Sequence, residues 1–204
     1  MPKLLEYKEL RERVWGQAEA IEHPDGGTVW LRPPESSEIP VLRDLLHTEI
    51  TPGAGTLDTM TKVFAHNRDS FWLIEQLSLS GGAPSVIGFY SFLPLNAEGR
   101  AALEAHTLNT IDPPLSLLAP FGEAPAALYI WAIVARRLMR RLMPSIARAM
   151  GLLYADAPIF ARVATEDGRK AGIGTGFSAS AGAPEIQLGS LIQLPPWSKG
   201  GALA

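Results

Sequence analysis

Apolar residues in the second half of the chain change from strand-like to helix-like spacing. The run Leu128-Tyr-Ile-Trp-Ala-Ile-Val134 has the β-branched and aromatic content of a buried strand. From 136 to 151 the apolar residues recur at helical intervals instead, with the arginines away from the apolar stripe. The stripe consists of Leu138, Met139, Leu142, Met143, Ile146 and Met150. A buried strand followed by an amphipathic helix is therefore predicted.

A second strand and a shorter helix follow. Pro158–Val163 is again strand-like, and Thr165 can cap a helix that carries Glu166 and Asp167 in its first turn and ends near Gly174–Phe177. The order strand, helix, strand, helix predicts a βαβ crossover, which favours parallel pairing of the two strands.

The first half of the chain and the C-terminal end add further elements. Strands that pair antiparallel before the parallel crossover would make the sheet a mixed one. The expected strands are Thr28–Arg32, Phe71–Gln76, Ser85–Leu93 and Glu185–Leu194, with Ser178–Ala183 as a flexible connection. The expected helices are one capped by Ser36 or Ser37, with Pro40 in its first turn, and Leu57–His66.

Residues 94–127 form an unusually long connection between two strands. A short helix is expected at Ala97–Ala105, followed by the proline-punctuated segment up to Pro125. Such a segment is commonly either a functional lid or a mobile loop, and the sequence leaves both open. As a lid, its leucine and phenylalanine content would indicate an apolar acceptor pocket.

Composition excludes several classes of function. The net charge of -3 gives no reason to expect nucleic acid, although arginines cluster at 136–141. The absence of cysteine among 204 residues excludes disulfides, cysteine nucleophiles and thiolate metal sites. No apolar segment approaches the roughly 20 residues that span a bilayer, and the N-terminus lacks the apolar core of a signal peptide. We therefore expect a cytoplasmic protein with no membrane partner.

The N-terminal residues 3–21 have an amphipathic helical pattern. This helix packs either on the core or on a second subunit, so the pattern is compatible with a homodimer. The predicted organisation is an N-terminal helical extension at 1–27, one domain at 28–194 that includes the 94–127 insertion, and a tail at 195–204.

The stretch from Ala127 to Phe177 resembles the acyl-CoA-binding core of the GNAT (Gcn5-related) N-acetyltransferase superfamily. The resemblance lies in the element order, in the closing pair Gly176-Phe177, and in Val29-Trp-Leu-Arg-Pro33 before the first helix. It implies an α/β fold with a mixed, mostly antiparallel sheet, flanking helices, and a fourth and fifth strand that are parallel and splay apart.

The resemblance also implies transfer of an acetyl or other acyl group from acyl-CoA to an amine of a small molecule or peptide. By this resemblance, Ile133, Val134 and Ala135 end the fourth strand, and their backbone groups would bind the pantetheine arm of acetyl-CoA. The phosphates would lie at the start of the following helix, where the macrodipole favours an anion. The arginines expected to contact them are Arg136, Arg137, Arg140 and Arg141. The other interpretation of these arginines is a solvated basic helix face.

Several positions depart from the pattern of the superfamily. Aligned on Arg136, the positions of the phosphate-binding glycines hold Met139 and Arg141, and the tyrosine that protonates the thiolate in many members is Gly172. Glu75 is a possible base, but a glutamate near a strand end is usually surface charge. The four histidines have no metal-ligand spacing. We therefore assign no catalytic residue and no metal.

Two other functions remain open. A GNAT-fold binding or regulatory protein that has lost catalysis would explain the missing glycines and tyrosine. The segment Leu10–Trp15 is similar to the N-terminal region of acyl-homoserine-lactone synthases, which share the fold, so an acyl-CoA-dependent synthase is the third interpretation.

Overall fold

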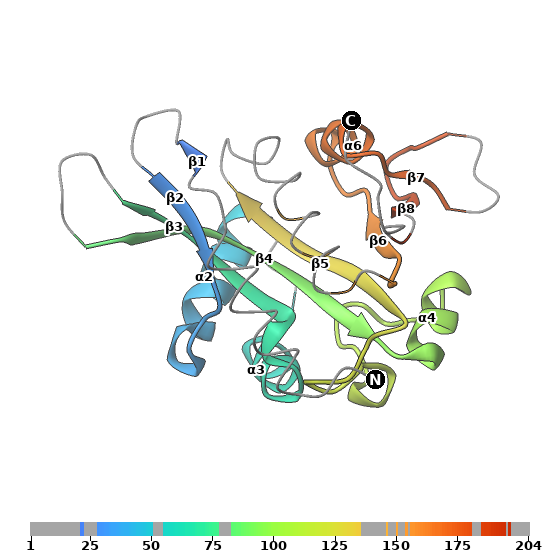
Figure 1. Cartoon of the computed structure of the whole chain (residues 1–204), viewed down its shortest axis with the longest axis horizontal. Helices are drawn as coiled ribbons and strands as arrows, with labels where there is room; N and C mark the ends of the chain where they lie inside the picture. The colour runs from blue at the N-terminus through green and yellow to red at the C-terminus, as the bar shows by residue number, and fades with distance from the viewer. Residues whose placement is uncertain are drawn as a thin grey trace.

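A single mixed sheet runs through the molecule (Figure 1). The computed structural model describes residues 21–22, 28–50, 55–77, 83–135, 146, 150, 154, 156–180, 185–194 and 196. The strand order is β1-β2-β3-β4-β5-β6-β8-β7, and of these neighbours only β5 and β6 are parallel. The strands are β1 Ile21–Glu22, β2 Thr28–Arg32, β3 Phe71–Leu77, β4 Ser85–Leu95, β5 Ala127–Ala135, β6 Ile159–Arg162, β7 Ser178–Ala179 and β8 Leu191–Leu194. The predicted mixed, mostly antiparallel sheet is confirmed.

The described helices begin at polar caps. Thr56, Asn96 and Thr165 each accept a hydrogen bond from a backbone N–H of the first turn, which satisfies one of the donors that a helix leaves free at its start. The α-helices are α2 Ile39–Glu49, α3 Leu57–His66, α4 Ala97–Glu104 and α6 Glu166–Gly174, and the short 3₁₀ turns are η1 Ser36–Glu38, η2 Arg68–Ser70 and η3 Leu115–Leu117. The predicted cap at Thr165 is confirmed, and the predicted helix bounds agree with the observed ones to within a few residues. The predicted cap at Ser36 or Ser37 is wrong, because these residues lie within η1 and Glu38 is the N-cap residue of α2.

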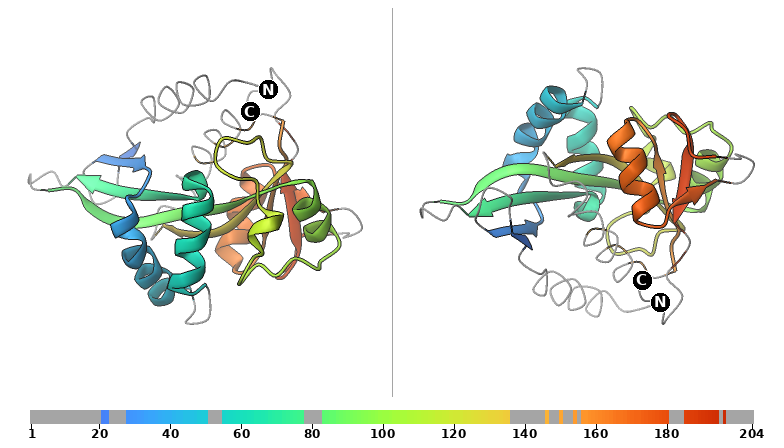
Figure 2. Two further views of the ribbon diagram at one scale, coloured as in Figure 1. Left: turned by 90° about the horizontal axis from the view of Figure 1, so that it is seen from below. Right: turned by 90° about the horizontal axis from the view of Figure 1, so that it is seen from above.

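Each face of the sheet carries its own hydrophobic core, because side chains alternate between the faces along each strand. Helices α2 and α3 lie side by side on one face (Figure 2). Their core includes Leu42, Met60, Phe71, Phe89 and Leu118. The opposite core contains Trp72, Tyr90, Ile146, Met150 and Phe177. Ile146 and Met150 belong to the predicted apolar stripe, and both are buried.

The 94–127 segment is tied to the sheet and to α3 at several points. Asn67 donates its side-chain amide to the Ala119 carbonyl at 3.1 Å, and the Phe121 N–H donates to the His66 carbonyl at 3.0 Å. Leu103 and Leu118 are buried in the core beneath α2 and α3. The segment therefore supplies part of a core, and whether the rest of it acts as a lid stays a prediction.

Two predictions near the C-terminal end are wrong. Ser178–Ala179, expected in a flexible connection, forms strand β7 on the edge of β8. The expected strand at Glu185–Leu194 starts only at Leu191, because a turn closed by the Ser190 N–H and the Gln187 carbonyl precedes it, with Gly189 at φ 88°. Small residues can pair as an edge strand whenever a neighbour offers free backbone groups, and composition alone does not reveal that neighbour.

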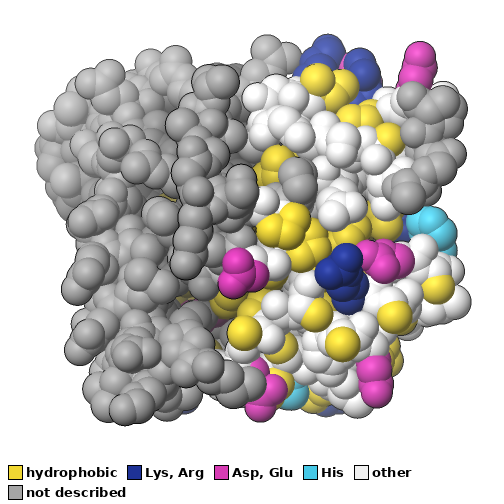
Figure 3. All heavy atoms as spheres, turned by 45° about the vertical axis from the view of Figure 1, so that its right-hand side comes forward, with side chains coloured by type: hydrophobic (Ala, Val, Ile, Leu, Met, Phe, Trp, Pro, Cys, Tyr) yellow, Lys and Arg dark blue, Asp and Glu magenta, His cyan; other side chains and the backbone are white. Residues whose placement is uncertain are grey.

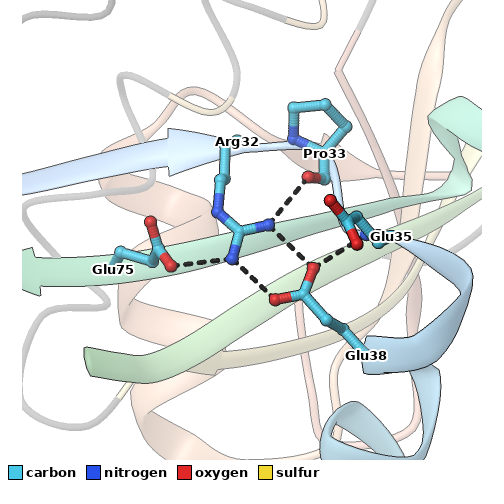
Figure 4. A network of polar contacts seen from close by, with 5 residues as sticks. All are labelled: Arg32, Pro33, Glu35, Glu38 and Glu75. Carbon is cyan, nitrogen blue, oxygen red and sulfur yellow. Dashed lines mark hydrogen bonds and ion pairs between the residues drawn. The ribbon is translucent and has the colours of Figure 1, made fainter. Parts of the chain in front are cut away.

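Glu75, expected on the surface, is buried with 7% of its area exposed. It lies at a register shift between β3 and β4 and accepts a hydrogen bond of 2.8 Å from the Arg32 guanidinium (Figure 4). Arg32 also makes two hydrogen bonds to the Glu38 carboxylate, at 2.6 and 2.8 Å. The hydrogen bonds from Arg32 hold the pKa of Glu38 below its ordinary value of 4.5. This network joins β2, β3 and the start of α2.

Of the predicted helix after β5 only Ile146 and Met150 are described, and most of the tail at 195–204 lies outside the described residues. The N-terminal helix predicted at 3–21 also lies outside them except for Ile21, which forms strand β1 with Glu22 instead. In the part of the chain that is described, no helix is long and apolar enough to cross a bilayer.

Candidate active-site cleft

The two parallel strands pair over only a short distance. Leu128, Tyr129 and Ile130 of β5 are opposite Ile159, Phe160 and Ala161 of β6. Beyond these three pairs the described strands separate, and a cavity of ≈ 640 Å³ opens between residues 131–135 and residues 162–165. The predicted splay of the two parallel strands is therefore present, and it creates the cleft.

The cleft end of β5 has an edge with no partner strand in the described part of the chain. Residues 132–135 pair with β4 on one side, and no described strand pairs with residues 131–135 on the other. A register shift between Ser91 and Phe92 leaves Trp131 as an extra residue, a β-bulge that disrupts the ladder locally. Unpaired strand-edge N–H and C=O groups can bind an extended ligand as an additional strand.

Gly88 lets β4 approach this part of β5 closely. A Cβ atom at position 88 would lie only 2.0 Å from the Val134 carbonyl oxygen. Gly88 is opposite Ala135 in the register, at the far end of the cleft wall. The close approach of β4 and β5 in the cleft wall therefore requires glycine at position 88.

Helix α6 forms the other side of the cleft. Asp167, Gly168, Ala171 and Gly172 line it, together with Phe177 beyond the helix. Gly172 is buried, and a Cβ atom there would lie 2.9 Å from Cδ1 of Ile192. The position at which the superfamily often has a tyrosine thus lies in the cleft but carries no proton donor.

Among the described residues, three ionisable side chains line the cleft: Glu49, Arg162 and Asp167. Arg162 is the last residue of β6, and its Nη1 donates a hydrogen bond of 3.0 Å to the Gly189 carbonyl. The Tyr129 side chain on β5 interacts with it, and burial raises the pKa of Tyr129 while the positive charge of Arg162 opposes that rise. Tyr129 is buried and stays neutral at physiological pH.

The 94–127 segment contacts the bulge. The Trp131 indole N–H donates a hydrogen bond of 2.6 Å to the Thr110 carbonyl. A Cβ atom at Gly55, which precedes α3, would lie 3.6 Å from Cζ2 of the same indole ring. The segment therefore borders the cleft wall on the face that carries α2 and α3.

The sequence-predicted binding residues divide into two groups. Ile133, Val134 and Ala135 lie in the cleft wall, as the resemblance implies for a pantetheine site. Arg136, Arg137, Arg140 and Arg141 lie outside the described residues. Sequence reasoning missed Glu49 and Arg162, since a lone charged residue at an element's end gives no signal until its neighbours are known.

The face seen in Figure 3 carries charges of both signs. On the side of α4, β6 and α6, hydrophobic side chains form a band among scattered charged residues of both signs (Figure 3). Among the described residues no group of three or more histidine, aspartate or glutamate side chains could hold a metal ion.

Several solved structures are similar to this chain over most of its length. Diaminobutyrate acetyltransferase of Paenibacillus lautus matches with a TM-score of 0.53 at 12% identity, covering 87% of this chain and 100% of the other. A GNAT-family acetyltransferase of Listeria monocytogenes has a TM-score of 0.53 at 14% identity, with 86% and 99% covered. The chain has the GNAT fold. No protein-family model matches the sequence, and no curated protein matches it.

A further structure supports the same comparison. A putative acetyltransferase of Salmonella typhimurium, solved with acetyl-CoA, has a TM-score of 0.51 at 10% identity and covers 85% of this chain and 96% of the other. Identities this low show the shared fold alone. The parallel strands β5 and β6 of this chain correspond to the fourth and fifth strands of the GNAT fold.

Proposed function

We propose that this protein is an acyl-CoA-dependent N-acetyltransferase acting on an amine of a small molecule or peptide. The observation that carries the proposal is the cleft between β5 and β6, with the free edge of residues 131–135 on one wall. The similar structures described above include acetyltransferases solved with coenzyme A or acetyl-CoA. The shape and the unpaired backbone suit the pantetheine arm of an acyl-CoA substrate.

The chain's own residues would bind and orient the two substrates. Backbone groups of Ile133, Val134 and Ala135 would pair with the pantetheine amides, and the apolar wall would exclude water. The amine nitrogen attacks the thioester carbonyl carbon, the carbon–sulfur bond breaks, and the amine proton leaves as the thiolate takes one up. Positioning the two reactants in this way supplies much of the rate acceleration of such a transfer.

The phosphates of the acyl-CoA would be bound by the arginine cluster that follows β5. Arg136, Arg137, Arg140 and Arg141 come directly after the cleft wall in sequence. Arginine makes charge-assisted, bidentate hydrogen bonds to phosphate, and so it can replace the glycine turn of other members.

A second candidate is a binding or regulatory protein that retains the acyl-CoA site without turnover. The observation that favours it is Gly172, which lies in the cleft where a tyrosine would donate the proton to the thiolate. Ala164 and Thr165 likewise occupy the positions where many members have an asparagine. An acetyl-transfer assay separates the two candidates.

The proposal is tested by thermal unfolding with and without acetyl-CoA. Binding at about 100 times the dissociation constant should stabilise the native state by about 2.7 kcal/mol. The double variant Arg136→Glu/Arg137→Glu should lose this shift. The control Arg68→Glu/Arg100→Glu makes the same change in net charge at exposed or partly exposed sites outside the cleft and should keep it.

The outcomes distinguish the candidates. Stabilisation by acetyl-CoA together with release of free thiol in the presence of an amine supports the transferase. Stabilisation without turnover of any amine supports the binding protein. No stabilisation with millimolar acetyl-CoA would contradict both.

A further inference from the structure

Arg162 is held in place at the edge of the cleft, and no carboxylate of the described residues neutralises it there. Its guanidinium donates to the Gly189 carbonyl at 3.0 Å and interacts with the Tyr129 side chain, so two separate elements fix it. In the described part of the chain it forms no ion pair. By contrast Arg32, Arg100 and Arg169 each contact a carboxylate.

The position of Arg162 along β6 determines the face of the sheet on which its side chain lies. Its neighbour Phe160, two residues before it on β6, packs in the core beneath α2 and α3, as does Tyr129. Since alternate residues of a strand share a face, Arg162 points to that same face. This is the face on which the 94–127 segment borders the cleft wall through Thr110.

The described residues of the cleft also include two carboxylates, Glu49 at the end of α2 and Asp167 in the first turn of α6. Neither of them forms an ion pair with Arg162. An acceptor that carries a carboxylate beside its amine would give the Arg162 guanidinium a partner of opposite charge, and a diamine would not.

We propose that Arg162 binds the carboxylate of the acceptor, so that the acceptor is an amino acid or a similar small amine that carries a carboxylate. This inference rests on the proposed function. The guanidinium has five N–H donors, and with its Nη1 bonded to the Gly189 carbonyl it can still make a bidentate contact to a carboxylate. Tyr129 and the Gly189 carbonyl then act as positioning groups, because they fix the guanidinium without contacting the reacting atoms.

The test uses the twenty common L-amino acids and, for each active one, its carboxamide, in which the carboxylate is replaced and the amine is kept. The wild-type protein should acetylate the acids with kcat/KM about 10- to 100-fold above that for the amides, the factor that a charge-assisted hydrogen bond provides. Arg162→Gln should remove this preference by raising KM for the acid, while the dissociation constant of acetyl-CoA stays unchanged. Arg162→Lys should retain part of it.

A binding measurement without turnover provides a second readout. Calorimetric titration of the active amino acid into protein saturated with coenzyme A should show binding that Arg162→Gln weakens by a similar factor.

Equal use of acids and amides by the wild-type protein would overturn the inference while leaving the transferase intact. A weaker affinity of Arg162→Gln for acetyl-CoA would also overturn it, because Arg162 would then be contacting the phosphates. Absence of acetyl-CoA binding by the wild-type protein would overturn the proposed function itself, and the inference with it.

Discussion

Two strands of the sheet end in arginine, and their surroundings differ. Strand β2 pairs with β3 along its whole length, and its last residue, Arg32, is bound to Glu38 and Glu75. Strand β6 leaves β5 after three pairs, and its last residue, Arg162, lies at a cleft without a carboxylate partner among the described residues. The first region satisfies its charges internally, and the second leaves a cation and a strand edge available to a ligand. We infer that the first region stabilises the fold and that the second binds substrate.

The largest effect is expected from Gly88→Ala, which should disrupt the strand pairing that supports the cleft. The new methyl group would overlap the Val134 carbonyl oxygen and force β4 and β5 apart. Overpacking of this kind costs about 1–3 kcal/mol, or more where backbone must move. Urea unfolding measures this loss.

The control for this variant is Gly174→Ala in α6, where an added Cβ atom meets nothing within 4 Å. It should raise stability by about 0.4–1 kcal/mol, because alanine reduces the entropy of the unfolded chain. Equal effects of the two substitutions would contradict the close approach of β4 and β5.

Filling the cleft should abolish ligand stabilisation without unfolding the protein. Ala164 is exposed and lines the cleft, so Ala164→Trp should remove the shift of about 2.7 kcal/mol expected at about 100 times the dissociation constant of acetyl-CoA. Ala101→Trp places the same side chain on an exposed position of α4 and should keep the shift. Thermal unfolding with acetyl-CoA measures both, and retention of the shift in Ala164→Trp would place the ligand elsewhere.

Much of the difference between the Arg32 region and the Arg162 region could not be predicted from the sequence. Helix α3 and strand β2 have the predicted bounds, because their periodicity and the Thr56 cap are local signals. Glu75 looks like surface charge until β2 brings Arg32 beside it, 43 residues away in sequence. Arg162 looks like a strand-end charge until Gly189 and Tyr129 fix its guanidinium.

The cleft itself was more predictable than its charged residues. The order of elements from Ala127 to Phe177 indicates a parallel pair joined by a crossover, and Ile133, Val134 and Ala135 follow as the wall. The bulge at Trp131 was not predictable, because nothing in an apolar run reveals the register of its neighbour. Strand β7 was missed for a similar reason, since its pairing depends on the free edge of β8.

A smaller change in unfolding free energy should distinguish the Arg32 region from the Arg162 region. Glu75→Gln removes a nearly buried partner of Arg32 and should cost about 1–2 kcal/mol of unfolding free energy, with acetyl-CoA stabilisation unchanged. Arg162→Gln should change unfolding by no more than about 0.5 kcal/mol, because the residue is exposed. The reverse ranking in chemical denaturation would contradict the division into a stabilising and a binding region.

The smallest effect is the pH dependence of the Arg32 network. The pKa of Glu38 is below its ordinary value of 4.5 in the folded protein because of the hydrogen bonds from Arg32. A carboxyl group with a depressed folded-state pKa stabilises the protein at pH values above its unfolded-state pKa, and this contribution is lost as the pH falls through the folded-state value. The difference in stability between the wild type and Glu38→Gln should therefore be present at pH 7 and disappear at acid pH. A difference that stayed constant down to pH 2 would mean that the Glu38 charge contributes nothing.

The measurement that tests the account most directly is amide hydrogen exchange along β5 with and without acetyl-CoA. The end of β5 at Leu128–Ile130 pairs on both sides and should exchange slowly in either condition. The cleft end at residues 131–135 should become markedly slower when acetyl-CoA binds, because the ligand would complete the pairing of its free edge. Slower exchange confined to other parts of the protein, with residues 131–135 unchanged, would show that this edge does not bind the acyl-CoA.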